Sequence, residues 1–245
     1  MKVIVISGTP EGRRLSAALA ELGAQVAVCV ATEYGAEEQG RIPGVRVHTG
    51  RMEPSAMVQL MQGADLCIDA THPYAAVATA NIRQASQEAG VLCKRLLRPA
   101  SPLPPGSLTA PDAAAAAALL QDTTGNILLT TGAKELAAFS CLGVQRLYPR
   151  VLPSAESLGA CENAGIPHRN VIAMQGPFST ELNVALLRQF KIAYLVTKDG
   201  GPQGGFAEKA EAARRTGTVL VVIRRPADTG ETEESILQFC KGLIP

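Results

Sequence analysis

Tryptophan is absent from this 245-residue sequence, and aromatic residues make up only 4% of it. Proteins that bind single-stranded nucleic acid stack bases on aromatic side chains, so the composition argues against such a platform. The formal net charge is only +1, and a general nucleic-acid or membrane-surface role normally needs a surplus of positive charge. We therefore expect neither partner. A small anionic ligand is still compatible, because it needs only a local cluster of basic residues.

Long apolar runs and metal-binding patterns are also missing. No apolar stretch approaches the roughly 20 residues of a membrane span, and the start of the chain lacks a signal-peptide pattern, so we expect a cytoplasmic protein. No two of the six cysteines form a C-x-x-C pair, and the three histidines are scattered, so we expect no metal site. The sequence has neither a G-x-S-x-G turn nor a Walker lysine loop.

What the chain does contain is a regular alternation of apolar strand-like runs and amphipathic helices. Hydrophobic residues make up 47% of it, enough for a substantial core. We predict strands over 2–7, 25–31, 45–48, 66–70, 91–97, 127–131, 145–151, 171–174, 192–197 and 218–223. We predict helices over 13–22, 52–61, 74–89, 113–120, 154–164, 180–190, 206–215 and 233–241. This order predicts an α/β fold with two doubly wound, mainly parallel sheets.

A segment with four prolines and a glycine, residues 98–106, interrupts the alternation. It can continue neither a helix nor a central strand, so we interpret it as a linker between domains. We predict an N-terminal Rossmann-like dinucleotide-binding domain over 1–99 and a C-terminal α/β domain over 106–245.

Four polar side chains follow the apolar run at 66–68, namely Asp69, Thr71, His72 and Tyr74. Ligands of open α/β sheets bind beyond the carboxyl ends of the strands, which is where these residues are expected. His72 precedes a proline and is therefore held extended. The alternative for Thr71 is a structural role as the cap of a helix starting near residue 73.

The turn after the first predicted strand, residues 8–12, has the sequence GTPEG. Glycines let a backbone approach a phosphate, and a helix N-terminus offers free N–H groups to an anion. The spacing is not G-x-G-x-x-G, so on its own it is a weak indication. Glu11 has an alternative role in complementing the helix dipole. Arg13 is the better candidate for a phosphate contact, whereas Arg14 is at least as well explained by a solvated helix face.

Thr32 and Glu33 follow the second strand, about 20 residues after these glycines. An acidic residue there often binds the ribose hydroxyls of NAD. Arg41, Arg46 and Arg51 come soon afterwards and suit the 2′-phosphate of NADP. The sequence leaves the choice open.

Three strand ends of the second half are equally polar: residues 130–134 (TTGAK), 175–179 (QGPFS) and 198–201 (KDGG). Several such tips on one sheet edge suggest a ligand site more than ordinary turn chemistry. Lys134 and Lys198 bring cations to that edge, and a ligand with several carboxylates or phosphates would suit them. Other basic residues that would add to it are Arg95, Arg98, Arg146 and Arg150. A salt-bridged surface is the alternative for Arg146 and Arg150.

Taken together, these segments resemble the precorrin-6A reductase family of cobalamin biosynthesis. The resemblance is carried by residues 7–13 (SGTPEGR), 31–35 (ATEYG), 48–51 (HTGR), 68–75 (IDATHPYA), 129–136 (LTTGAKEL), 173–179 (AMQGPFS), 196–201 (VTKDGG) and 208–209 (EK). It runs to residues 225–226, nearly the whole chain. Pro10, Ala133 and Gly200 depart conservatively from the expected pattern, although Pro10 removes one N–H from the phosphate turn.

The resemblance implies hydride transfer from NADP(H) to one double bond of a carboxylate-rich tetrapyrrole, giving precorrin-6B, with NAD(H) as the alternative where the substrate contains cobalt. It implies an active-site cleft between the two domains, and transient contact with neighbouring pathway enzymes. His72, Tyr74 and Lys198 are the candidate proton donors, although water or a substrate carboxyl group would also serve. The implied cofactor-binding residues are Gly8, Thr9, Glu11, Arg13, Thr32, Glu33, Gly50, Arg51, Asp69 and Thr71. The implied substrate-binding residues are Thr131, Gly132, Lys134, Gln175, Gly176, Phe178, Ser179, Lys198, Asp199 and Lys209.

Two other functions compete with this one. A cofactor-free tetrapyrrole lyase or cyclase with two α/β halves, in outline like uroporphyrinogen-III synthase, would not need the turn at Gly8. A non-catalytic dinucleotide-sensing module would not need the cations of the second half, so it predicts no effect of Lys134→Ala or Lys198→Ala.

Overall fold

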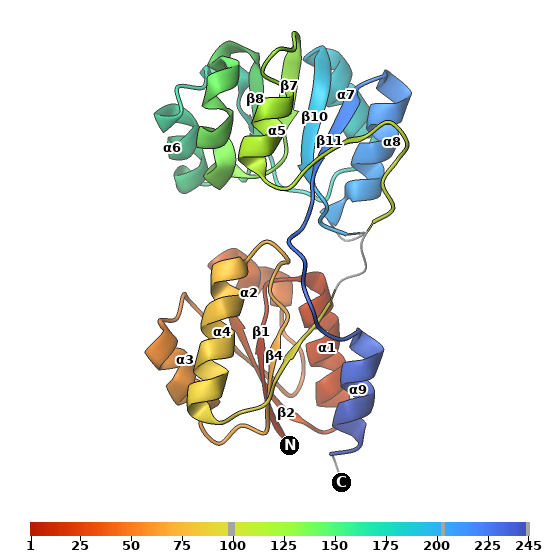
Figure 1. The fold of residues 1–245 in the computed structure, drawn as a ribbon. Helices are drawn as coiled ribbons and strands as arrows, with labels where there is room; N and C mark the ends of the chain where they lie inside the picture. The colour runs from red at the N-terminus through yellow and green to blue at the C-terminus, as the bar shows by residue number, and fades with distance from the viewer. Residues whose placement is uncertain (98–100, 202–203, 244–245) are drawn as a thin grey trace. The chain divides into compact units, whose positions relative to one another are not determined.

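The computed structural model describes residues 1–97, 101–201 and 204–243 (Figure 1). Its contacts divide the chain into two compact units. One unit comprises Met1–Pro99 together with Ala227–Pro245, and the other comprises Ala100–Pro226. Each unit is built around one parallel sheet. The predicted fold class, two Rossmann-like α/β domains with parallel sheets, is confirmed.

The first unit has a five-stranded sheet in the order β3-β2-β1-β4-β5, with every pair parallel. Its strands are β1 (Lys2–Ile6), β2 (Gln25–Val30), β3 (Val45–Thr49), β4 (Leu66–Asp69) and β5 (Cys93–Arg95). Its helices are α1 (Pro10–Glu21), α2 (Glu33–Gln39), α3 (Pro54–Met61), α4 (Ala76–Ala89) and α9 (Glu233–Lys241). The central strands β1 and β4 are buried on both faces, as a parallel sheet covered by helices requires.

The last segment of the chain corrects the predicted domain division. We expected residues 106–245 to form the second domain, but residues 227–245 belong to the first unit. Helix α9 packs against α1 (Figure 1), and its Ile236 and Cys240 are fully buried in the core of that unit. Glu231 also forms a parallel bridge with Leu96. The amphipathic pattern predicted the helix itself, but an apolar stripe does not show which sheet it covers.

The second unit has a six-stranded sheet in the order β6-β11-β10-β7-β8-β9, again parallel. Its strands are β6 (Leu108–Ala110), β7 (Asn126–Leu129), β8 (Leu147–Val151), β9 (Ile172–Ala173), β10 (Ile192–Lys198) and β11 (Val219–Ile223). Its helices are α5 (Ala113–Leu119), α6 (Ala155–Asn163), α7 (Thr180–Gln189) and α8 (Phe206–Thr216), with 3-10 segments η1 (Ala133–Leu142), η2 (Val144–Arg146) and η3 (His168–Asn170).

Most predicted elements match the observed ones within a few residues, and helix 233–241 matches at both ends. Helix α4 begins at Ala76 rather than at Tyr74. Helix α2, strand β6 and the 3-10 segments η1, η2 and η3 were not predicted. Helix α2 has the sequence EYGAEEQ, which contains too few apolar residues to show a period. Strand β6 has only three residues, which is too short for an alternation to be read.

Candidate functional site

In each unit some of the predicted site residues lie where the strand order reverses. In the first unit the chain runs outward through β1, β2 and β3 and then returns to place β4 on the other side of β1. In the second unit the corresponding pair of strands is β7 and β10. Ligands of doubly wound sheets bind at the carboxyl ends of such strand pairs. The first pair ends at the Gly8 turn and at Asp69–His72, and the second at Thr130–Lys134 and at Lys198–Gly201.

The β1–α1 turn is tied to the end of β4 by Thr9. The Thr9 hydroxyl accepts a hydrogen bond from the backbone N–H of Gly12 at 3.1 Å and donates one to the carbonyl of Ala70 at 2.9 Å. A Cβ atom at Gly12 would overlap Ser7 Oγ, so this glycine allows the helix to pack closely on the strand end. The Thr9 hydroxyl is engaged in the cap, so Thr9 would contact an anion through its backbone.

Gly8 leaves open space in this turn because it has no side chain. Its φ is +127°, which strongly favours glycine, and no atom lies within 4 Å of the place where a Cβ would be. Close by, the buried Ser7 Oγ has no hydrogen-bond partner among the residues that the structure describes. Open space at Gly8, next to the N-terminus of α1, suits a phosphate-bearing cofactor. Glu11 is buried in the first turn of α1.

The two arginines of α1 have different surroundings. Arg13 is exposed, and its Nε donates to the carbonyl of Gln39 at 3.0 Å. Arg14 pairs with Glu233 of α9 at 3.0 Å on the solvent-exposed surface. This pair confirms the solvated-face interpretation of Arg14. The phosphate contact of Arg13 stays a prediction.

The residues expected on the ribose side lie at the ends of two neighbouring strands, β2 and β3. Thr32 caps α2 by accepting from the N–H of Gly35 at 3.0 Å, and the exposed Glu33 begins that helix. Gly50 donates to the carbonyl of Val30 at 2.9 Å, with a φ of +125° and open space around its Cα. Arg51 follows it and is exposed. The pairing of β2 with β3 therefore brings these residues to one edge.

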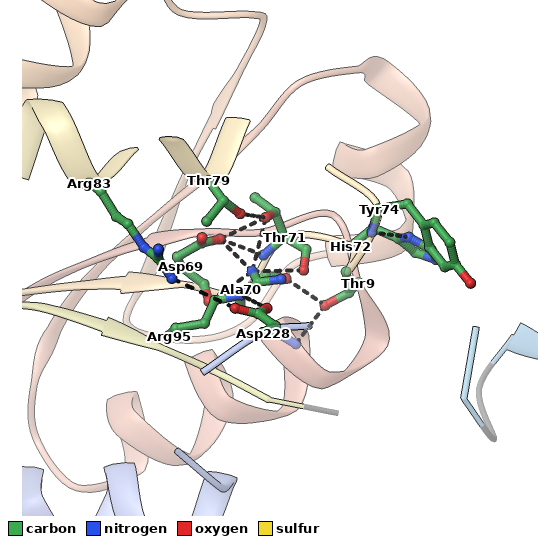
Figure 2. A network of polar contacts seen from close by, with 11 residues as sticks. Thr9, Asp69, Ala70, Thr71, His72, Tyr74, Thr79, Arg83, Arg95 and Asp228 are labelled. Carbon is green, nitrogen blue, oxygen red and sulfur yellow. Dashed lines mark hydrogen bonds and ion pairs between the residues drawn. The ribbon is translucent and has the colours of Figure 1, made fainter. Parts of the chain in front are cut away.

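A buried polar network holds the end of β4 (Figure 2). Asp69 is 1% exposed, and its Oδ1 accepts from Arg95 Nη1 at 2.7 Å and from the hydroxyl of Thr71 at 2.7 Å. Arg95 also pairs with Asp228 at 2.8 Å. Thr71 thus binds Asp69 and does not cap α4, whose N-terminal cap residue is Ala75. The capping alternative for Thr71 is wrong, because the Asp69–Arg95 pair engages its hydroxyl.

His72 and Tyr74 lie together, apart from that network. Their ring centroids are 5.5 Å apart, and the backbone N–H of Tyr74 donates to His72 Nδ1 at 3.4 Å. Figure 2 shows both side chains pointing away from Asp69 and Arg95. His72 is exposed. Since β1 and β4 are neighbours, the two rings belong to the same sheet edge as the Gly8 turn.

At the switch point of the second unit, Lys198 and Asp199 are each paired. Lys198 forms an ion pair with Glu135 at 2.5 Å, and Asp199 pairs with Arg225 at 3.2 Å. Thr131, at the end of β7, is 8% exposed, and its hydroxyl lacks a partner within the described ranges. The neighbouring Gly132 has open space at its Cα, and Lys134 is exposed.

Arg150 and Lys209 form a second cationic group in this unit. Arg150 of β8 donates to Asn183 Oδ1 at 2.8 Å, and its guanidinium lies 4.0 Å from the centroid of the Phe178 ring. Lys209 of α8 is buried, and its Nζ donates to the carbonyl of Gly204 at 3.2 Å. Burial, with the nearby Arg150 charge adding to it, lowers the pKa of Lys209 to about 7, although Glu208 opposes the shift.

The remaining predicted residues here are Gln175, Gly176 and Ser179. Gln175 is exposed, Gly176 precedes a cis proline, and Ser179 caps α7 by accepting from the N–H of Leu182 at 3.2 Å. The salt-bridged-surface alternative is wrong for both arginines. Arg150 is buried, and Arg146 donates to the carbonyls of Thr123 and Gly125. Sequence reasoning missed Asn183 because a helical asparagine carries no distinctive signal.

Within the described ranges, no helix combines the length and apolar character that crossing a membrane requires. In the same parts of the chain, no group of three or more histidine, cysteine, aspartate or glutamate side chains is placed to hold a metal ion.

Comparison with known proteins gives consistent matches. The model of the precorrin-6x reductase CbiJ/CobK family matches residues 2–241. The cobalt-precorrin-6A reductase of Methanothermobacter thermautotrophicus is 34% identical over 92% of this chain and 77% of its own length. The precorrin-6A reductase of Rhodococcus erythropolis is 33% identical over 95% of this chain and 92% of its own. A solved CobK precorrin-6A reductase superposes with a TM-score of 0.77 at 26% identity, over 98% of this chain and 96% of that one.

Proposed function

The chain belongs to the precorrin-6x reductase CbiJ/CobK family, and we propose that it reduces one double bond of precorrin-6A, or of its cobalt form, to give precorrin-6B. The observation that carries this proposal is the family match over residues 2–241. The relatives that match nearly full length are named cobalt-precorrin-6A or precorrin-6A reductases. The protein is accordingly an oxidoreductase of cobalamin biosynthesis.

A nicotinamide cofactor supplies the hydride when it is bound. The open Gly8 turn supports a phosphate position at the N-terminus of α1. Thr9 fixes this turn against the end of β4, and Arg13 would add positive charge beside it. Asp69 and Thr71 would contribute mainly by keeping the backbone of residues 70–72 in place, since Arg95 engages both side chains.

NADP(H) is the cofactor form that we propose, with NAD(H) as the alternative for a cobalt-containing substrate. Thr32, Glu33, Gly50 and Arg51 share one sheet edge, where the adenosine ribose of a dinucleotide is expected. Arg51 is exposed there and would pair with a 2′-phosphate. Glu33 would disfavour that phosphate, so the two side chains act in opposite directions.

The substrate side lies in the second unit in this proposal. Lys198, Lys134, Arg150 and Lys209 bring positive charge to the carboxyl ends of its strands, as a polycarboxylate requires. The side chains that would deliver a proton are His72, Tyr74 and Lys198. His72 is exposed and therefore able to meet a ligand, whereas Lys198 is already paired with Glu135.

The cofactor-free lyase or cyclase is not favoured. Such an enzyme would not need the turn at Gly8 as a phosphate site, and the matches are to proteins named as reductases. The dinucleotide-sensing module is likewise less well supported than an enzyme of this family.

Initial rates with NADPH and NADH, each with precorrin-6A and cobalt-precorrin-6A, test the function and the cofactor choice together. We expect loss of nicotinamide absorbance with at least one combination, and a product carrying two more hydrogens than the substrate. If none of the four combinations consumes the nicotinamide, the proposed reaction is wrong.

A further inference from the structure

Two positively charged side chains of the second unit are buried at the same sheet edge without a carboxylate partner. Arg150 and Lys209 are each 8% exposed. The partner of Arg150 is the neutral amide oxygen of Asn183, and that of Lys209 is the carbonyl of Gly204. Neither forms an ion pair within 4.0 Å among the described residues. The residues outside the described ranges contain no aspartate or glutamate side chain.

The other buried or partly buried cations at these strand ends are neutralised. Arg95 contacts Asp69 at 2.7 Å and Asp228 at 2.8 Å. Arg225 pairs with Asp199, and Lys198 pairs with Glu135. A buried charge is costly unless it is paired, so this chain supplies a carboxylate at each of those positions. Arg150 and Lys209 are the exception.

The two cations also repel each other. The charge of Arg150 is among the causes that lower the pKa of Lys209, after burial itself. Glu208 offsets part of this repulsion but is not within ion-pairing distance. A ligand anion entering here would remove the repulsion and pair both groups, and binding would therefore gain from both.

The surroundings fit a carboxylate in particular. Arg150 lies near the end of β8, Lys209 in the first turns of α8, and Asn183 in the first turn of α7. The Phe178 ring packs on the Arg150 guanidinium and holds it in one plane. A planar, fixed guanidinium beside an ammonium matches the two oxygens of a carboxylate. The unpartnered Thr131 hydroxyl ends the neighbouring strand β7.

We propose that Arg150 and Lys209, oriented by Asn183 and Phe178, form the binding site for one carboxylate of the tetrapyrrole substrate. The proposal rests on the proposed function for the identity of the ligand. It adds Arg150 as a substrate-binding residue and gives Lys209 a defined partner. It also explains why this chain leaves the two charges without a carboxylate of its own.

The test compares Arg150→Met and Lys209→Met with the wild type. Both replacements are apolar and of similar volume, so the variants should fold, and their unfolding midpoints check this. We expect the KM for the tetrapyrrole to rise at least about tenfold in each variant, the change expected for one lost charge-assisted contact. The KM for NADPH should stay within about twofold. Arg214→Gln, which alters an exposed residue of the same helix α8, is the matched control.

Charge-conserving variants separate a binding role from a structural one. Lys209→Arg should recover most of the lost tetrapyrrole affinity, and Arg150→Lys only part of it, because lysine keeps the charge but not the planar guanidinium. An unchanged tetrapyrrole KM in both methionine variants would overturn the proposal. A rise in the NADPH KM instead would show that the site holds a cofactor phosphate, and would overturn it equally.

A binding assay keeps the result separate from the proposed reaction. Uroporphyrin, a tetrapyrrole with many carboxylates, is titrated into each protein at low salt and followed by its fluorescence. Weaker binding by both methionine variants would support the carboxylate site even if the wild type reduced neither form of precorrin-6A. Equal binding by wild type and variants would refute the site even if the wild type were an active reductase.

Discussion

At the scale of single residues, pairing distinguishes the cations of this protein. Arg95, Arg225 and Lys198 each contact a carboxylate, and those contacts hold the strand ends in place. Arg14 forms a surface pair of the kind that contributes at most about 1 kcal/mol. Arg13, Arg150 and Lys209 have only neutral hydrogen-bond partners in the described ranges. The residues without a charged partner are therefore the ones with charge left for a ligand.

Lys209 should make the stability of the protein depend on pH. Its pKa is about 7 in the folded chain and has its ordinary value, near 10.5, in the unfolded chain. Between these values the unfolded chain binds more protons, so the free energy of unfolding of the wild type rises with pH. Lys209→Met removes this titration. In a buffer without polycarboxylates, the variant should be more stable than the wild type near about pH 6, and the difference should fall by at least about 2 kcal/mol by about pH 10.

Denaturant unfolding at both pH values measures this difference. A difference that stayed constant across the range would mean that Lys209 keeps its ordinary pKa in the folded protein. Arg214→Gln, at an exposed position on the same helix, controls for general pH effects on unfolding.

Arg13 and Arg14 form a natural matched pair, because they are neighbours with different partners. Arg13→Ala should weaken NADPH binding about tenfold, the effect of losing one charge-assisted contact. Arg14→Ala should leave it unchanged, because Arg14 is paired with Glu233. Nicotinamide fluorescence on titration of each variant gives both affinities. Equal affinities would remove Arg13 from the phosphate site.

His72 follows β4 and is exposed, and a kinetic measurement tests its role. His72→Ala should lower turnover by about tenfold or more, as expected on loss of a general acid, while the affinity for NADPH stays nearly the same. His168→Ala changes another exposed histidine, far along the chain, and should leave both quantities unaltered. Wild-type turnover in His72→Ala would assign His72 a purely structural role at the end of β4.

At the scale of elements, α9 is part of the core of the first unit although it follows the second unit in the sequence. Ile236 and Cys240 are fully buried in one core cluster with residues of β1, β2 and α1, and α9 contacts α1. Lys94 pairs with Glu231 at 2.5 Å, and the N–H of Leu97 donates to the carbonyl of Glu231 at 2.9 Å, so the segment before α9 is anchored at β5. The first unit is thus completed by residues that follow the whole second unit in the sequence.

Truncating one of these side chains should be costly. Ile236→Ala removes a fully buried side chain, and such changes reduce the free energy of unfolding by about 2–5 kcal/mol. Leu243→Ala, at a position that is 52% exposed, should change it by less than about 0.5 kcal/mol. Urea unfolding followed by far-UV circular dichroism compares the two. If Ile236→Ala were as stable as the control, α9 would not be part of the core.

At the scale of the whole molecule, the chain passes from the first unit to the second and back. The crossing near residue 100 was predicted from its prolines, and the return near residue 227 was not. A single cut in the exposed stretch at 105–106 would divide the chain into two fragments. Helix α9 belongs to the second fragment but lies in the core of the first unit.

A protease site inserted between Pro105 and Gly106 tests this. After cleavage the two fragments should elute together on size exclusion without denaturant. The same cleavage in an Ile236→Asp variant should release them, because a charge replaces a buried apolar contact. Separate elution of the wild-type fragments would contradict the assignment of α9 to the first unit.

The sequence by itself determined the features that depend on neighbours along the chain. Alternating apolar runs and amphipathic helices were enough to predict two parallel α/β units, and polar residues after Ile68, Leu129 and Val196 marked the strand ends. Only the tertiary structure decided which helix covers which sheet and which cations have carboxylate partners. Those outcomes depend on contacts between residues far apart in the sequence: Arg95 meets Asp228, and Arg150 meets Asn183 rather than an acid. No local pattern specifies such a partner, because the chain must fold before the two side chains are neighbours.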